Sequence, residues 1–133
     1  MIGAGGAASG IAFALCRHAI DQLLIFNRSP KKAEILIARL KTYYPLVEIS
    51  YASQISNIQD LLINATSVGM HERDRPPLSL SKLDSSTLVA EVIIRPEMTC
   101  TLKEAIMRGC TIHQGIHMLK AQIRLMLDFM NDD

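Results

Sequence analysis

Short apolar runs alternate with longer amphipathic stretches along most of this sequence. Runs of this kind are typical of strands buried on both faces of a sheet, and they cover residues 22–26, 47–50, 60–64 and 87–94. Residues 110–113 predict a brief last strand before the final amphipathic stretch. The strands are thus predicted to be short and separated by connections long enough for helices.

The stretches between these runs have helical spacing and recognisable ends. Small and apolar residues dominate 7–19, and Ser29 with Pro30 is a typical helix start for a second helix that ends near Tyr43. Thr99 is expected to cap a third helix that Gly109 ends. A last helix opens at Gly115, and its apolar side carries Ile116, Leu119, Ile123, Met126, Leu127 and Met130.

Strands that alternate with helices predict a parallel sheet covered on both faces. With right-handed crossovers this is a doubly wound, Rossmann-like α/β fold, here one domain over residues 1–133. Only Met1 and Ile2 precede Gly3, whereas a central strand is normally about five residues long. The first central strand is therefore expected to be truncated, which exposes two sheet edges to strand swapping, to homodimerisation or to another segment.

Composition excludes several classes of function. The formal charge of +1 argues against a broad surface for nucleic acid or anionic membrane. No apolar run approaches the roughly 20 residues that span a bilayer. The three cysteines lack metal-ligand spacing, so no metal site is predicted, and free thiols indicate the cytoplasm.

The first chemical signal is the glycine-rich turn at the amino terminus. Gly3, Gly5 and Ala8 fit the pattern Gly-x-Gly-x-x-Gly/Ala, which joins a strand to a helix and brings backbone amides to a pyrophosphate. The dipole of the following helix favours an anion at the same place. An ordinary tight turn is the alternative explanation for this short pattern.

The second signal is a basic turn that follows the second strand. An NAD-binding domain usually places an acid there for the ribose hydroxyls. This chain has instead Asn27, Arg28, Ser29, Lys31 and Lys32. A guanidinium and ammonium groups suit a 2′-phosphate, so this spacing favours NADP over a merely solvated helix start.

Four motifs together resemble the shikimate/quinate dehydrogenases. They are 3–7, 27–29, 64–70 (Asn-Ala-Thr-Ser-Val-Gly-Met) and 115–122 (Gly-Ile-His-Met-Leu-Lys-Ala-Gln), and they occur in the family's order and spacing. The resemblance covers essentially the whole chain and corresponds to the family's C-terminal, NADP-binding half. It implies reversible reduction of 3-dehydroshikimate, or 3-dehydroquinate, by NADPH in the biosynthesis of aromatic amino acids.

The resemblance also implies the roles of individual residues. The pyrophosphate would lie on Gly3, Ala4, Gly5, Gly6 and Ala7, and the 2′-phosphate on Asn27, Arg28, Ser29 and Lys32. Asn64, Thr66 and Ser67 would line the ribose and nicotinamide, Gly115 and Met118 would contact the nicotinamide, and Gln122 would bind the substrate. Met118 and Gln122 are four residues apart, so they share one face of a helix. A core methionine and a surface glutamine are the alternative reading of that pair.

The chain departs from the family at three points. Glu91 and Ile94 stand where the family usually has Asp and Tyr, and His117 adds bulk where the family has a small residue. The catalytic Lys–Asp pair that the resemblance assigns to the preceding half has no counterpart in residues 1–133. The isolated chain is therefore expected to be inactive. A non-catalytic nucleotide-binding or interaction module, and a relative acting on quinate or another polyol acid, are the alternatives.

Overall fold

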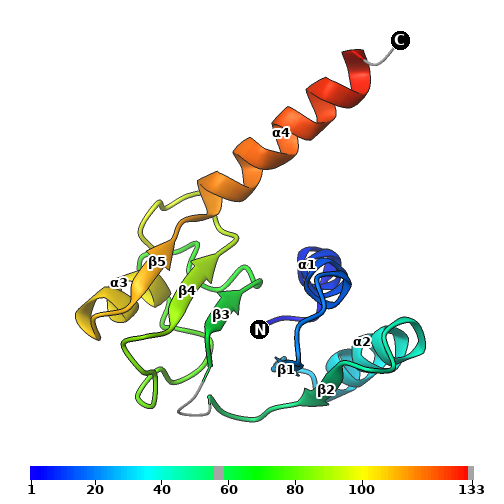
Figure 1. The fold of residues 1–133 in the computed structure, drawn as a ribbon. Helices are drawn as coiled ribbons and strands as arrows, with labels where there is room; N and C mark the ends of the chain where they lie inside the picture. Colours follow the sequence, from blue (N-terminus) through cyan, green and yellow to red (C-terminus); the bar gives the residue numbers. More distant parts are fainter. Residues whose placement is uncertain (56–58, 132–133) are drawn as a thin grey trace.

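The computed structural model describes residues 1–55 and 59–131, and these form alternating strands and helices (Figure 1). The strands are β1 (Gln22–Ile25), β2 (Glu48–Tyr51), β3 (Leu61–Asn64), β4 (Leu88–Glu91) and β5 (Thr111–His113). The helices are α1 (Gly6–Arg17), α2 (Pro30–Tyr43), α3 (Cys100–Met107) and α4 (Gly115–Asn131).

The strands are parallel and fall into two groups that the amino terminus joins. β1 pairs with β2, and β4 lies between β3 and β5. Ile2 forms parallel bridges to Phe26 on one side and to Asn64 on the other. The spatial order is thus β2, β1, the amino terminus, β3, β4, β5, which confirms a doubly wound sheet whose first central strand is truncated.

Two apolar clusters cover the two faces of the sheet. Because side chains alternate along a strand, Met1 and Ile63 pack in the cluster with α1 and α2. The neighbouring Ile2 and Leu62 pack on the opposite face, where the cluster includes Leu102 of α3. The N-terminal two residues therefore belong to both halves of the core.

β4 is shorter than the β-forming run predicted. The strand was expected to continue to Ile94, but it ends at Glu91. The Val92 N–H still donates to the Asn64 carbonyl of β3 at 3.2 Å, and this is the last bond between the two strands. The Glu91 carboxylate accepts from the N–H groups of Val92 and Ile93 at this point. At the start of α2, Ser29 occupies the N-cap position but its side chain makes no capping hydrogen bond, whereas Thr99 caps α3 as predicted.

The carboxyl-terminal helix does not lie on the sheet. Figure 1 shows α4 projecting away from the other elements, and Gly115 is its one buried residue among those described. The predicted apolar side is correspondingly exposed, since Met126 is 64% and Met130 71% accessible. None of the helices in the described residues combines the length and apolar character needed to cross a membrane.

Candidate functional site

Parallel strands place their carboxyl ends at one edge of the sheet, and three of the predicted motifs meet there. The N–H of Gly3 donates to the carbonyl of Phe26 at 2.7 Å, which ties the glycine-rich turn to the basic turn. Gly3 has φ +115°, and a Cβ there would lie 2.8 Å from the Ala65 carbonyl oxygen. Only glycine therefore allows the first turn to pack against the turn that follows β3.

The start of α1 has the properties of an anion-binding helix end. Gly5 is its N-cap and makes no side-chain capping bond, and the first turn contains no acidic residue. Gly5, Gly6 and Ala7 are exposed, whereas Ala8 is fully buried against the core. The start of α1 is thus exposed to solvent beside Gly3, which is the position an anion would take at a helix N-terminus.

The basic turn begins α2 and stands next to the glycine-rich turn. The side-chain amide of Asn27 donates to the Ser29 carbonyl at 2.9 Å and shapes the turn. Arg28 and Lys32 are exposed, and the first turn of α2 contains no acid. Two positive helix ends and at least two cationic side chains are therefore gathered at this edge.

A buried amide organises the turn that follows β3. Asn64 is fully buried, and its Oδ1 accepts from both the N–H (3.1 Å) and the hydroxyl (2.7 Å) of Thr66. Its Nδ2 donates to the Val68 carbonyl at 3.0 Å. Thr66 is half-buried and Ser67 exposed, so this turn presents both hydroxyl-bearing residues to the same edge on a fixed backbone.

The structure adds Glu91 as a positioning residue, where the sequence alone indicates only a replacement for Asp. Glu91 is 3% exposed, and its Oε2 accepts from Asn64 Nδ2 (3.0 Å) and from the Thr99 hydroxyl (2.9 Å). Burial raises the pKa of Glu91, and the four hydrogen bonds to the carboxylate partly offset that rise. A single acid ending an apolar strand is the sequence signal that could have pointed to this buried network.

The motif at the start of α4 is only partly brought to the site. A Cβ on Gly115 would collide with the Ile93 carbonyl, so glycine is required where α4 begins beside the end of β4. Met118 is half-buried, but Gln122 is exposed on the projecting part of α4. His117 is exposed and packs near His113, with ring centroids 4.8 Å apart.

Comparison with known proteins agrees with this arrangement. The family model for shikimate / quinate 5-dehydrogenase matches residues 1–72, more than half of the chain. The chain belongs to this family. Its resemblance to the family's cofactor-binding half, first suggested by the four motifs, is thereby confirmed.

Individual relatives extend the match beyond residue 72. The shikimate dehydrogenase (NADP(+)) of Geobacillus kaustophilus is 39% identical over 127 residues, which are 92% of this chain and 45% of that protein. The ligand-free 5-ketofructose reductase of a Gluconobacter strain superposes with a TM-score of 0.80 at 36% identity, over 89% of this chain and 44% of that one.

The shikimate 5-dehydrogenase of Thermus thermophilus, in complex with NADP(H) and shikimate, superposes with a TM-score of 0.76 at 28% identity. The match covers 89% of this chain and 42% of that one. The chain thus spans less than half the length of the relatives it matches, and shares with them the Rossmann-like fold.

Proposed function

We propose that residues 1–133 are the NADP(H)-binding domain of a shikimate dehydrogenase-type oxidoreductase. The observation that carries this proposal is the hydrogen bond from Gly3 to Phe26, because it sets the exposed start of α1 beside the basic start of α2. A pyrophosphate on the first and a 2′-phosphate on the second is the arrangement that NADP requires.

The residues have separate roles in this proposal. Gly3, Ala4, Gly5, Gly6 and Ala7 offer backbone to the pyrophosphate, while Asn27, Arg28, Ser29 and Lys32 hold the 2′-phosphate. Thr66 and Ser67 face the ribose and nicotinamide on a turn that the buried Asn64 holds in place, with Gly115 and Met118 on the other side of the ring. Bound NADPH supplies the hydride, and this chain's residues orient it and exclude water.

The substrate we propose is a shikimate-like hydroxy acid, held in part by Gln122. Hydride transfer needs the substrate at near-attack distance and a group that handles the proton. Residues 1–133 offer no counterpart of the family's Lys–Asp pair, so turnover requires a substrate-binding half from outside this sequence. Ile94, in place of the usual Tyr, favours a substrate that makes no hydroxyl contact there, including quinate or another polyol acid.

We further infer a cytoplasmic protein, since Cys16, Cys100 and Cys110 are all free thiols.

Homodimerisation remains a proposal that follows from the open sheet edges. A sedimentation measurement over a range of concentrations tests it. Mass that stays monomeric throughout that range would contradict it.

Titration with NADP⁺ and NAD⁺ tests the cofactor assignment. We expect NADP⁺ to bind more tightly, and Arg28→Ala to weaken NADP⁺ binding about 10-fold to 100-fold, because a hydrogen bond to a charged group contributes about 1.5–3 kcal/mol. NAD⁺ binding should be unchanged. Arg17→Ala, at the opposite end of α1, is the matched control and should leave both affinities alone.

Equal loss of NAD⁺ and NADP⁺ binding in Arg28→Ala would refute the 2′-phosphate role. A second measurement is shikimate oxidation by the purified chain with NADP⁺. We expect none, and measurable turnover would refute the division of the active site between two halves.

A further inference from the structure

Two exposed histidines lie side by side where β5 passes into α4. His113 is the last residue of β5, and His117 lies in the first turn of α4. Their ring centroids are 4.8 Å apart, and the ring planes are tilted by 39°. Within the part of the chain that the structure describes, neither imidazole makes a hydrogen bond. The ring nitrogens are therefore available to bind a ligand.

The fold fixes the backbone on both sides of this pair. β5 pairs in parallel with β4, which holds His113 in the sheet. The His117 N–H donates to the Gln114 carbonyl at 3.2 Å, and the Gln114 side chain donates to the Glu97 carbonyl at 3.3 Å. At Gly115 there is no room for a Cβ, so the start of α4 is closely packed. Binding a ligand between the two rings therefore costs only the freedom of two side chains.

The separation of the two rings is that of two imidazoles bound to one metal ion. A histidine nitrogen lies about 2.0–2.1 Å from Zn²⁺, which puts each ring centre about 3.2 Å from the ion. At the ligand angles of tetrahedral and octahedral sites, about 109° and 90°, two such ring centres lie about 4.5–5.2 Å apart. The observed 4.8 Å falls within that range. What remains is a rotation of each exposed ring that turns one nitrogen toward the shared ion.

The chemistry of the two ligands selects the kind of ion. Imidazole suits Zn²⁺, Cu²⁺ and Ni²⁺, whereas Mg²⁺ and Ca²⁺ prefer oxygen ligands. In the described residues no group of three or more His, Cys, Asp or Glu side chains could hold a metal ion. An ion between the two rings therefore has two protein ligands and keeps its other positions for water. The positive end of the α4 dipole disfavours a cation there only weakly, since this effect is screened at an exposed surface.

We propose that His113 and His117 together bind one divalent transition-metal ion of the class of Zn²⁺. The ion joins the last strand of the sheet to the first turn of the helix that projects from it (Figure 1). α4 has few other attachments, since Gly115 is its one buried residue among those described. Metal binding therefore restrains the direction in which α4 leaves the sheet. The proposal is independent of the nucleotide site, because it rests on no contact with a cofactor.

The test titrates the unaltered chain with Zn²⁺ in calorimetry, with Mg²⁺ as the hard-ion control. We expect saturable one-to-one binding of Zn²⁺, no binding of Mg²⁺, and a joint shift of the ring nitrogen resonances of His113 and His117 in NMR. Zn²⁺ should also slow hydrogen exchange at the amides of Leu119 and Lys120, because it restrains the start of α4. His113→Gln and His117→Gln should each weaken Zn²⁺ binding at least about tenfold, since either change leaves a single ligand and removes the effective concentration of the second.

His71→Gln is the matched control, because His71 is also exposed but lies in the segment between β3 and β4. It should leave the affinity for Zn²⁺ unchanged. The three substituted positions are exposed, so all the variants should fold as the unaltered chain does. Equal losses in His71→Gln and His117→Gln, or no Zn²⁺ binding to the unaltered chain, would overturn the proposal. One ion bound per two chains with a doubled sedimenting mass would show that Zn²⁺ bridges two copies, and would also overturn it.

Discussion

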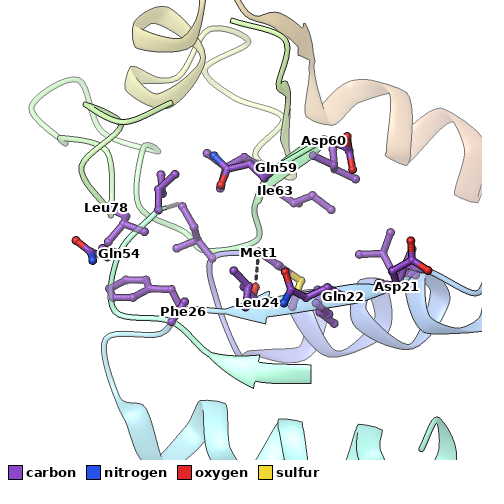
Figure 2. A pocket seen from close by; sticks show the side chains of 18 of the residues that line it. Met1, Asp21, Gln22, Leu24, Phe26, Gln54, Gln59, Asp60, Ile63 and Leu78 are labelled. Carbon is purple, nitrogen blue, oxygen red and sulfur yellow. Dashed lines mark hydrogen bonds between the residues drawn. The ribbon is translucent and has the colours of Figure 1, made fainter. Parts of the chain in front are cut away.

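The two ends of β3 have opposite character. At its carboxyl end, Asn64 is fully buried and bonds to Thr66, Val68 and Glu91, so every contact is made within the chain. At its amino end, Leu61 lines a cavity, shown in Figure 2, and is 36% exposed. One short strand thus has a closed polar network at one end and a cavity at the other.

This difference shows which part of the sheet the fold itself stabilises. The network at the carboxyl end fixes the turn that follows β3 before any ligand arrives, which lowers the entropic cost of binding there. At the amino end the same strands border a cavity, and no comparable network is found there among the described residues. The carboxyl edge is therefore the preorganised one.

The largest effect should come from removing the acid that closes the network. Glu91→Ala removes the acceptor of one Asn64 Nδ2 hydrogen, of the Thr99 hydroxyl and of the Ile93 N–H, whereas the Val92 N–H keeps the Asn64 carbonyl. Buried donors that lose a charged acceptor make us expect a loss of about 4 kcal/mol in the free energy of unfolding, measured with urea.

Glu97→Ala is the matched control for this variant, because Glu97 is exposed and no side-chain contact of it contributes to the network. It should change the free energy of unfolding by less than about 0.5 kcal/mol. Similar losses of unfolding free energy in the two variants would show that the Glu91 network stabilises the fold no more than a surface residue does. The contrast between the two ends of β3 would then be wrong.

A somewhat smaller effect should come from Gly3→Ala, which disturbs the contact between the glycine-rich turn and the turn that follows β3. The new Cβ would approach the Ala65 carbonyl in a backbone conformation of φ +115°, so we expect a loss of about 3 kcal/mol. Gly10→Ala is the control, since it lies within α1 with open space around it and should stabilise the chain by about 0.5–1 kcal/mol. NADP⁺ titration should show lost binding only in Gly3→Ala; intact binding there would contradict the tight turn.

Much of the fold could be predicted from the sequence because its signals are local. Apolar runs and helix ends placed each described element within a few residues, and Thr99 caps α3 as expected. The parallel, doubly wound sheet followed from the alternation of strand and helix. The truncated central strand followed from counting the residues before Gly3.

What could not be predicted depends on partners distant in the sequence. The run after Glu91 is strongly β-forming, yet pairing stops after the Val92 N–H, and the Ile93 N–H donates to the buried Glu91 carboxylate instead of to a strand. The apolar side of α4 has helical spacing, but spacing does not say whether anything covers it. The place of Gln122 relative to the glycine-rich turn could not be predicted for the same reason.

The smallest effect is a change of about 2 kcal/mol in the free energy of unfolding with pH. It concerns Met1, which lines the cavity at the amino end of β3. The Met1 amino group has a pKa of about 6 in the folded chain against 8.0 for the exposed group. Between these values the unfolded chain binds the proton and the folded chain does not, so the free energy of unfolding should rise from pH 6 to pH 8. Below pH 6 the amino group is protonated in both states, so the free energy of unfolding no longer changes with pH because of this group. Acetylating the amino group should remove this rise. The same slope in the acetylated chain would show that the Met1 amino group is solvated in the folded chain.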